Sequence, residues 1–355
     1  MSILWMIFGL GVLLMGAELL VRGGSRLAAS FGVPPLVVGL TVVAFGTSAP
    51  ELAVSLGAGL QGRADLAAGN VVGSNIFNIV VILGLAAAIT PLTSSLRVIR
   101  WEVPFLIAVS VLPSLLAWDG ILSRPEALCL VIVGIGYIVW QIRQARTEPD
   151  ASETPTPAIS EAGSGSSRAL AAVQVVGGLA LLVAGSRLFV DGATTLARSL
   201  GVSELIIGLT VVAAGTSLPE VAASATAALR GERDMAIGNV LGSNIFNIVF
   251  VLGLSTTVSA SQTVIPRSLL TFDLPVMIVL SILCLPIFFT DLSVTRSEGI
   301  GLLLAYVGYT TLQILATTGS PHLALARNAL LIAAVFASSA VLLATFVQLS
   351  KRRGR

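Results

Sequence analysis

Long apolar stretches recur along the chain and are separated by short polar segments. Most of them hold about 20 residues, the length that an α-helix needs to cross ~30 Å of hydrocarbon. The pattern therefore predicts membrane-spanning helices rather than the core of a soluble protein. The predicted spans are residues 3–29, 35–60, 67–90, 102–118, 124–143, 170–198, 204–229, 236–259, 272–290, 297–317 and 326–349.

Polar positions inside these stretches follow a pattern that occurs twice. GLTVVAFGTSAPELAVS at 39–55 recurs as GLTVVAAGTSLPEVAAS at 208–224, and GNVVGSNIFN at 69–78 recurs as GNVLGSNIFN at 238–247. Both pairs of blocks share an offset of 169 residues, and weaker matches extend the repeat on either side. Each copy contains five predicted spans, so the second copy enters the membrane upside down relative to the first. The sequence thus predicts an inverted repeat.

The predicted fold is an all-α polytopic membrane protein. Two inverted five-helix repeats form a ten-helix core, and one extra C-terminal transmembrane helix follows. We expect the first repeat in residues 1–145, the second in 169–318, and the extra span with a basic tail in 319–355. Residues 146–168 are rich in Pro, Ser, Thr and Gly and cannot bury enough apolar surface to fold, which predicts a flexible linker.

Composition supports a membrane protein and excludes several other classes. Of 355 residues, 55% are hydrophobic and 11% are charged, whereas a soluble domain has roughly 25% charged residues. The net charge of +2 comes from scattered basic residues and gives no sign of nucleic-acid binding. The first apolar stretch lacks the charged region and cleavage signal of a signal peptide, so we expect a retained span.

Histidine and cysteine offer little chemistry. The only histidine, His322, falls in a predicted loop, which excludes a histidine metal site within the membrane. Cys129 and Cys284 lie in apolar stretches and are not related by the repeat, so we expect small core residues rather than a disulfide or metal ligands.

The distribution of basic residues favours one orientation in the membrane. With the N-terminus outside, fourteen Lys and Arg residues fall on the cytoplasmic side and six on the opposite side. Because cytoplasmic loops carry an excess of Lys and Arg, we expect the N-terminus outside, with the central linker and C-terminal tail in the cytoplasm.

The strongest functional signal is a pair of acidic residues, Glu51 and Glu220, inside the predicted spans. A charged side chain there costs at least ~2.5–3.5 kcal/mol and usually has a function. A single buried glutamate could merely hold helices together, but a second in a matching context makes that interpretation weak. Two carboxylates that meet near the pseudo-two-fold axis repel each other unless a cation lies between them. We therefore predict a cation site.

Neighbouring polar residues supply further oxygen atoms. In each copy, a Thr-Ser pair precedes the glutamate by four and three residues, so we expect both hydroxyls on its helical face. In each copy a Ser and an Asn are also spaced by four. Hard cations such as Ca²⁺ and Na⁺ prefer oxygen ligands of this kind. The candidate ligands are Glu51, Glu220, Thr47, Ser48, Thr216, Ser217, Ser74, Asn78, Ser243 and Asn247.

Two repeated prolines indicate bent helices. Pro50 and Pro219 lack an N–H, which predicts that the carbonyls of Gly46 and Gly215 are released from helical hydrogen bonds. Released carbonyls that line a cavity could bind a cation. The alternative is a kink that only aids packing.

Other repeated residues suggest structural roles. We expect four glycines to permit close helix approach, two asparagines to brace the bent helices, and two oppositely charged pairs to form ion pairs near the membrane interfaces. The glycines are Gly69, Gly73, Gly238 and Gly242; the asparagines are Asn75 and Asn244; the charged pairs are Glu18/Arg22 and Arg187/Asp191.

The paired GTSxPE and GNxxGSNIFN blocks resemble the α-repeats of the sodium/calcium exchanger family, within the cation/Ca²⁺ antiporter superfamily. The resemblance covers roughly residues 3–317. It implies an antiporter that exchanges Na⁺ for Ca²⁺ by alternating access, with the first and sixth helices sliding past a rigid core of eight. It also implies ligation by the backbone carbonyls of Ala44 and Ala213, and competition of both ions for Glu51 and Glu220.

The resemblance further implies Ca²⁺ and Na⁺ as substrates, with no cofactor and no enzyme activity. The expected surroundings are the lipid bilayer of a prokaryotic plasma membrane, with no nucleic acid and no obligatory protein partner. Two features depart from the family. Some relatives, including potassium-dependent ones, have aspartate at the position of Asn247, so asparagine there favours potassium independence and leaves two acidic ligands. The eleventh span exceeds the usual ten.

Three alternatives remain. A Ca²⁺/H⁺ exchanger of the same fold could use protonated glutamates, although the proton-coupled branch typically has a second acid in the GN block. A passive cation channel fits matched inverted halves less well than alternating access does. An intramembrane enzyme is least favoured, because the sequence offers no set of nucleophile and base within the spans.

Overall fold

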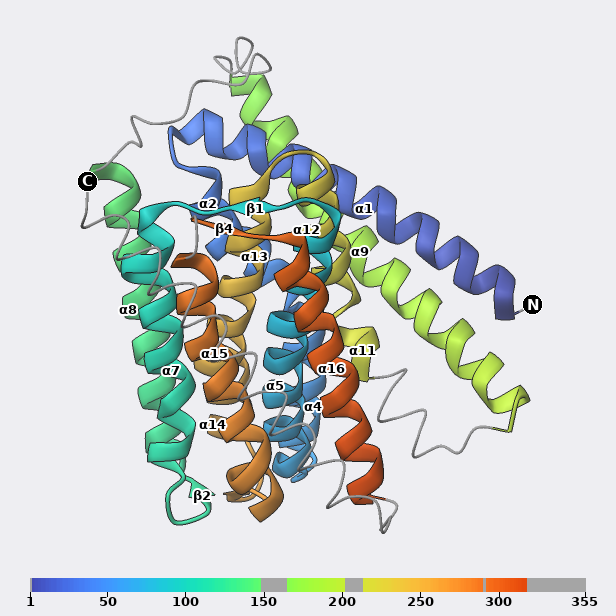
Figure 1. Ribbon diagram of the computed structural model, residues 1–355, viewed down its shortest axis with the longest axis vertical. Coiled ribbons are helices and arrows are strands. Elements are labelled where there is room, and N and C mark those ends of the chain that lie inside the picture. Colours follow the sequence, from blue (N-terminus) through green and yellow to red (C-terminus); the bar gives the residue numbers. More distant parts are fainter. Residues whose placement is uncertain (1, 148–164, 202–212, 290–291, 318–355) are drawn as a thin grey trace.

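A computed structural model describes residues 2–147, 165–201, 213–289 and 292–317, and it is a bundle of long helices (Figure 1). The first repeat contains α1 (Ser2–Phe31), α2 (Pro35–Val38), η1 (Gly39–Val43), α3 (Ala44–Thr47), α4 (Ala49–Leu60), α5 (Ala64–Phe77), η2 (Asn78–Leu83), α6 (Gly84–Ile89), β1 (Leu92–Thr93), η3 (Val98–Glu102), α7 (Val103–Leu116), β2 (Ile121–Leu122) and α8 (Arg124–Thr147).

The second repeat has the same order of elements over its described residues. It contains α9 (Gly165–Ser199), α11 (Ala213–Thr216), α12 (Leu218–Leu229), α13 (Arg233–Phe246), η6 (Asn247–Leu252), α14 (Gly253–Thr257), β3 (Thr263–Val264), η7 (Leu269–Asp273), α15 (Leu274–Phe289), β4 (Ser293–Val294) and α16 (Arg296–Thr317). The η elements are π-helical turns, which often occur inside helices at functional sites. η2 and η6 begin at the equivalent residues Asn78 and Asn247.

The predicted membrane spans agree well with the observed helices. The described residues contain eight helices long and apolar enough to cross a membrane, or nine when Pro35–Thr47 and Ala49–Leu60 count as one bent span. The span predicted at 204–229 is described from Ala213 onward, and the eleventh span, at 326–349, lies outside the described residues. Both helices flanking the predicted linker extend into it, because α8 continues to Thr147 and α9 begins at Gly165.

Two short antiparallel ribbons join the repeats at opposite ends of the bundle. In one ribbon β1 pairs with β4 and Leu92 faces Val294; in the other β2 pairs with β3 and Ile121 faces Val264. Each ribbon therefore takes one strand from each repeat. The β1–β4 ribbon lies at the end of the bundle opposite to β2 (Figure 1). This arrangement is that of an inverted repeat.

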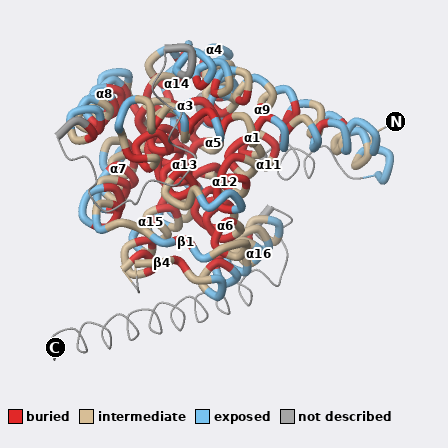
Figure 2. The backbone as a smooth tube through the Cα atoms, turned by 90° about the horizontal axis from the view of Figure 1, so that it is seen from above, coloured by how far each residue is buried: buried red, intermediate tan, exposed pale blue. Residues whose placement is uncertain are grey.

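The core of the molecule is the helix formed by α13, η6 and α14. Its apolar stretch is almost entirely buried, whereas most of the apolar stretch of α1 is not buried. Figure 2 shows this contrast, with α13 in the buried centre and the N-terminal end of α1 projecting from the body. Large apolar side chains such as Ile3, Leu4 and Phe8 are exposed on that end, as a lipid-facing helix requires.

Glycines of α13 permit the close helix approach predicted for them. A methyl group at Gly238 would lie 2.6 Å from the carbonyl oxygen of Leu36, and one at Gly242 would lie 2.7 Å from that of Leu40. Only glycine allows the backbones to approach this closely. For Gly69 and Gly73, the partners related by the repeat would fall in residues 202–212, outside the described part of the chain.

The helices α1 and α9 pack along each other through a second set of glycines, which the repeated motifs do not include. A methyl group at Gly16 would lie 2.8 Å from the carbonyl oxygen of Gly178, and one at Gly178 would lie 2.8 Å from that of Gly16. Gly9 and Gly185 form an equivalent reciprocal pair, at 2.9 and 2.8 Å. Figures 1 and 2 both show α1 and α9 side by side. The two helices thus form one tightly packed unit.

Adjacent glycines of α9 provide a test of this packing. We expect Gly178→Ala to lower the free energy of unfolding by about 1–3 kcal/mol, and with it the melting temperature of the purified protein. The reason is that the added methyl would meet the backbone of α1. The neighbouring Gly177 has nothing within 4 Å of an added methyl, so Gly177→Ala should be neutral or gain up to ~1 kcal/mol of helix propensity. Equal melting temperatures for the two variants would contradict the glycine-packed interface.

Candidate functional site

The two helices that carry the acidic residues are broken at equivalent positions. α3 ends at Thr47 and α4 begins at Ala49, with a bend of 46° between the two segments. Ser48 at this break has φ −79° and ψ 6°, and Ser217 at the corresponding break has φ −89° and ψ 6°. In each case a proline follows in the first turn of the next helix, where its missing N–H does no harm. The predicted bends are therefore present.

The breaks place each serine against the glutamate of the opposite repeat. The Ser48 hydroxyl donates to Glu220 Oε1 at 3.0 Å, and the Ser217 hydroxyl donates to Glu51 Oε1 at 2.8 Å. Both glutamate side chains are 0% exposed. Helical spacing predicts instead that each serine lies on the face of its own glutamate. That assignment was wrong because the helix is interrupted at the serine itself, so helical spacing does not hold across it.

The two carboxylates share one polar cluster. They are near enough to interact electrostatically, and the hydroxyls of Thr216 and Thr47 also interact with Glu51 and Glu220, respectively. Ser74 joins the cluster through its hydroxyl oxygen, which lies 3.5 Å from Ser217 Oγ. Thr47, Ser48, Ser74 and the two glutamates are thus brought together from both repeats.

Several buried oxygen atoms of the predicted ligands have no hydrogen-bond partner among the described residues. These atoms are Glu51 Oε2, Glu220 Oε2, Ser243 Oγ, Asn78 Oδ1 and Asn247 Oδ1. Buried polar atoms are rarely left unpaired, so a cluster of them indicates a place for a ligand. η2, which begins at Asn78, packs against α12, and η6, which begins at Asn247, packs against α4. Each asparagine therefore belongs to an element that lies beside the opposite repeat's glutamate helix.

The donor set suits a hard cation. Within the part of the chain that the structure describes, no three side chains of His, Cys, Asp and Glu come together. A cation here would rely on two carboxylates plus neutral hydroxyl, amide and carbonyl oxygens, the ligand chemistry of Na⁺ and Ca²⁺.

The backbone carbonyls near the breaks are occupied by donors in this structure. Ala44 O accepts the Ser48 N–H at 3.0 Å and the Thr47 hydroxyl at 3.4 Å. The Gly215 carbonyl accepts the Ser186 hydroxyl of α9 at 2.6 Å. Pro219 has no N–H to donate to the Gly215 carbonyl, and the hydroxyl of Ser186 from α9 donates to it instead. Ala213, the other predicted carbonyl ligand, is the first residue of α11.

Two asparagines of the GN pairs belong to the site and were not assigned a role from sequence. Asn70 Nδ2 donates to Ser55 Oγ at 3.0 Å and to Glu51 O at 3.4 Å. Asn239 Nδ2 makes the equivalent bonds to Ser224 Oγ at 2.8 Å and Glu220 O at 3.4 Å. Their recurrence at the repeat offset of 169 was the available signal.

Asn75 and Asn244 do not brace the bent helices, contrary to the prediction. Asn75 Nδ2 donates to the Asn244 carbonyl at 3.1 Å and so joins α5 to α13, while Asn244 Nδ2 donates to Val240 O at 2.8 Å within its own helix. The bracing role belongs to the asparagines five residues earlier, which face the broken helices.

The other expectations have mixed outcomes. Glu18 and Arg22 form the predicted ion pair at 2.5 Å, and Arg230 of the α12–α13 connection also pairs with Glu18. Arg187 and Asp191 are exposed on α9, and the described residues show no ion pair between them. Both cysteines are free, and Cys284 is buried as expected. Cys129 is exposed on the outer face of α8, so its assignment to the core was wrong.

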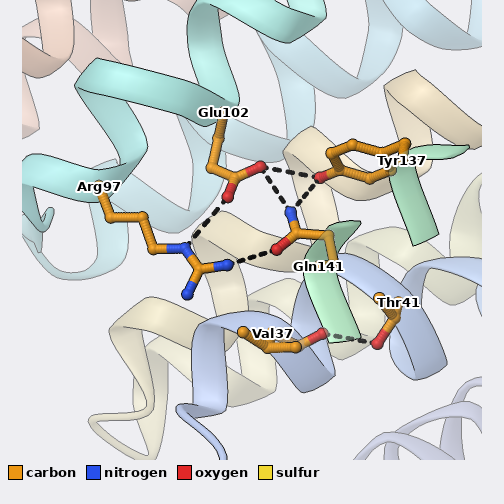
Figure 3. Close-up of polar contacts among 6 residues, drawn as sticks. All are labelled: Val37, Thr41, Arg97, Glu102, Tyr137 and Gln141. Atoms are coloured by element: carbon orange, nitrogen blue, oxygen red, sulfur yellow. Dashed lines mark hydrogen bonds and ion pairs between the residues drawn. The ribbon is translucent and has the colours of Figure 1, made fainter. Parts of the chain in front are cut away.

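A separate buried acid lies outside this cluster (Figure 3). Glu102 accepts hydrogen bonds from Tyr137 at 2.8 Å and Gln141 at 2.7 Å, and it pairs with Arg97 at 3.3 Å. These contacts join the start of α7 to α8. In the second repeat, Asp273 accepts hydrogen bonds from Tyr309 and Gln313 in the same way.

An integral membrane protein with inverted repeats and a buried, oxygen-lined cluster where the repeats meet has the architecture of a secondary ion transporter. A family profile described as "Sodium/calcium exchanger protein" matches residues 1–143 and 170–315. The chain belongs to the sodium/calcium exchanger family. It is accordingly a cation/Ca²⁺ antiporter of the membrane and not an enzyme.

Individual relatives agree with this assignment. The chain is 39% identical to the putative antiporter CaxA of Alkalimonas amylolytica over 309 residues, covering 86% of this chain and 96% of the relative. It is 32% identical to the sodium/calcium exchanger MaX1 of Methanosarcina acetivorans, covering 87% and 97% of the two chains. Inner membrane protein YrbG of Escherichia coli is 38% identical over 259 residues, which cover 72% of this chain and 80% of the relative.

A solved structure has the same fold. The sodium-calcium exchanger NCX_Mj, soaked with 10 mM Na⁺ and zero Ca²⁺, superposes with a TM-score of 0.75 at 30% sequence identity. The match covers 86% of this chain and 96% of that chain. The all-α inverted-repeat membrane fold predicted from sequence is therefore confirmed.

The Glu102 cluster generates a stability prediction. Tyr137→Phe removes a hydrogen bond to a buried carboxylate, so we expect a loss of about 1.5–3 kcal/mol in the free energy of unfolding. Binding of Ca²⁺ should be unchanged, because Tyr137 lies outside the Glu51–Glu220 cluster. Thermal unfolding of the purified protein, with and without Ca²⁺, measures both quantities. An unchanged melting temperature would show that the bond contributes nothing.

Proposed function

We propose that the protein exchanges Na⁺ for Ca²⁺ by alternating access, with both ions binding where the two repeats meet. The observation that carries this proposal is the reciprocal contact of Ser48 with Glu220 and Ser217 with Glu51. Two buried acids from opposite repeats share one cluster of oxygen atoms, several of them without a partner among the described residues.

The proposed ligands contribute different kinds of oxygen. Two carboxylates supply the charge, and hydroxyl, amide and carbonyl oxygens complete the coordination. The set is Glu51, Glu220, Thr47, Ser48, Thr216, Ser217, Ser74, Asn78, Ser243 and Asn247, with the carbonyls of Ala44 and Ala213. For Ala44 to bind a cation, its carbonyl would release the bond from Thr47, whose hydroxyl has other acceptors nearby.

Charge balance limits how the ions compete. One Ca²⁺ neutralises two ionised carboxylates, and at least two Na⁺ are needed to match it. A further Na⁺ held by neutral oxygens would make each cycle move net charge. Transport would then depend on membrane potential by ~2.3 kcal/mol per charge per 100 mV.

The motion we propose is a displacement of the α1–α9 unit against the remaining helices. The reciprocal glycine pairs between α1 and α9 support a common movement of these two helices. α9 also contacts both broken helices, because Leu179 packs on Gly46 while Ser186 donates to the Gly215 carbonyl. A shift of the α1–α9 unit would therefore change the contacts beside both helix breaks.

We place the protein in the plasma membrane of a prokaryotic cell, with the N-terminus outside and the central linker in the cytoplasm. The excess of Lys and Arg on one side of the predicted spans supports this orientation. Accessibility of a single cysteine introduced into the linker of a cysteine-free variant, in intact cells, tests it.

The second candidate is Ca²⁺/H⁺ exchange at the same site. The complete burial of Glu51 and Glu220 favours it, since buried carboxyls readily hold protons. Asparagine at positions 78 and 247 favours Na⁺ coupling, because the cluster then holds two acids and the remaining ligands are neutral.

Replacement of either glutamate tests the site. In proteoliposomes, Glu51→Gln and Glu220→Gln should each lower Ca²⁺ uptake driven by a Na⁺ gradient by more than about tenfold, since each removes half of the site's charge. Glu102→Gln is the matched control, because Glu102 is equally buried but lies outside the cluster. Exchange at the wild-type rate in both site variants would refute the site.

The driving ion and the charge moved per cycle need a separate experiment. We expect Ca²⁺ uptake with an outward Na⁺ gradient, none with a pH gradient alone, and acceleration by a membrane potential that is positive inside. The reversal potential should correspond to more than two Na⁺ per Ca²⁺. A ratio of two Na⁺ per Ca²⁺ would contradict net charge movement in each cycle. Uptake driven by a pH gradient alone would favour Ca²⁺/H⁺ exchange.

A further inference from the structure

Asn70 and Asn239, the asparagines of the two GN pairs, lie directly behind the proposed ligands without belonging to them. Asn239 is in α13 and is 1% exposed. Asn70 occupies the equivalent position of α5 and is half-buried. Both residues are neutral and neither is a proposed ligand. Their matching positions beside the two glutamate helices suggest that they orient the ligands.

The hydrogen bonds of Asn239 fix the orientation of its amide. A side-chain amide has two donor hydrogens and one acceptor oxygen. Nδ2 of Asn239 donates to Ser224 Oγ at 2.8 Å and to Glu220 O at 3.4 Å, so both donors are directed at α12. Nδ2 of Asn70 makes the same two contacts to α4, at 3.0 and 3.4 Å. The agreement of two separate copies supports this orientation.

With its donors committed, the amide of Asn239 presents its oxygen to Thr47 of the opposite repeat. The Thr47 hydroxyl donates to Asn239 Oδ1 at 3.1 Å. The same hydroxyl has two competing acceptors, the Ala44 carbonyl at 3.4 Å and the Glu220 carboxylate. A hydroxyl has one hydrogen, so these three acceptors decide where it points.

The direction of this hydrogen matters for cation binding. A hydroxyl binds a cation through a lone pair, and its hydrogen must then point away from the ion. If the Thr47 hydrogen points at Glu220, it lies between the hydroxyl oxygen and the carboxylates. Its partial positive charge would then repel a cation bound there. A hydrogen directed at Asn239 leaves the oxygen of Thr47 available to the ion.

We propose that Asn239 is a positioning residue that holds the Thr47 hydroxyl in its cation-binding orientation. This proposal deepens the proposed function and rests on it. Asn239 also ties the first turn of α12, which carries Glu220, to α13. One amide therefore orients a neutral ligand of one repeat and the acidic helix of the other.

The role has a consequence for ion selectivity. Ca²⁺ is held mainly by the two carboxylates, whereas Na⁺ depends more on neutral oxygens such as that of Thr47. Loss of the Asn239 acceptor should therefore weaken Na⁺ more than Ca²⁺. A single hydrogen bond contributes about 0.5–1.5 kcal/mol, which corresponds to a change of roughly two- to tenfold in the Na⁺ concentration for half-saturation.

A double-mutant cycle tests whether Asn239 acts through Thr47. The variants are Asn239→Ala, Thr47→Val and the combination, reconstituted in proteoliposomes. The Na⁺ half-saturation, the Ca²⁺ KM and the maximal rate are measured for each. We expect both single variants to raise the Na⁺ half-saturation with a smaller change in the Ca²⁺ KM, and the double variant to resemble Thr47→Val. Additive effects would overturn the proposal, because independent residues add.

Asn75→Ala is the matched control for a merely structural role. Asn75 is an equally buried asparagine whose amide donates to the Asn244 carbonyl and to Met277 Sδ, neither of which is a proposed ligand. It should lower the melting temperature while leaving the ratio of Na⁺ to Ca²⁺ constants unchanged. An equal change of that ratio in Asn75→Ala would also overturn the proposal.

Two further measurements keep the outcomes separate. If Asn239→Ala does not fold, Ser224→Ala replaces it in the cycle, because it releases one amide hydrogen of Asn239 and leaves the residue in place. Absence of Na⁺-driven Ca²⁺ flux in the wild-type protein would refute the proposed function. Calorimetric binding of Na⁺ and of Ca²⁺ to the purified variants would then still decide the role of Asn239.

Discussion

The structure depends on the burial of two carboxylates, Glu51 and Glu220, at the place where the repeats meet. A buried acid is tolerated only when polar groups surround it. Among the described residues, the serine hydroxyl that bonds each carboxylate comes from the other repeat, because Ser48 donates to Glu220 and Ser217 donates to Glu51. The two halves therefore need each other to satisfy their charges. This requirement explains why the broken helices, the prolines after the breaks and the flanking asparagines all occur in pairs.

The way the helices pack separates a fixed part of the molecule from a part suited to move. α13, η6 and α14 are buried on nearly all sides, and the glycines of α13 bring it against α2 and η1. α1 and α9 instead pack mainly on each other through reciprocal glycines, and α9 also contacts the broken helices through Leu179 and Ser186. Much of the rest of their surface is not buried. Membrane helices associate through close backbone contact rather than through a hydrophobic driving force, so small residues determine which helices form a unit.

The repeat preserves some polar contacts and changes others. The acid–tyrosine–glutamine clusters at Glu102 and Asp273 occur in both halves. Within the described residues, an ion pair between an arginine and this acid is seen in the first half alone, from Arg97. The Ser186 bond to the Gly215 carbonyl likewise has no counterpart in the first half, where alanine, Ala17, occupies the equivalent position. The duplicated residues form the shared site. The two halves differ in contacts away from it, such as the Arg97 ion pair and the Ser186 hydrogen bond.

The sequence by itself determined the membrane class, the inverted repeat and the two buried acids of the polar cluster. Apolar length decides what can span a bilayer, and an odd number of spans per copy decides its inversion. The sequence did not determine which side chains pair. Helical spacing placed Ser48 beside Glu51, but the break at Ser48 turns its hydroxyl to Glu220. The glycine contacts between α1 and α9, the bracing by Asn70 and Asn239, and the exposed position of Cys129 also depend on tertiary structure. Pairing across repeats is set by the packing of helices far apart in sequence, and no local periodicity records it.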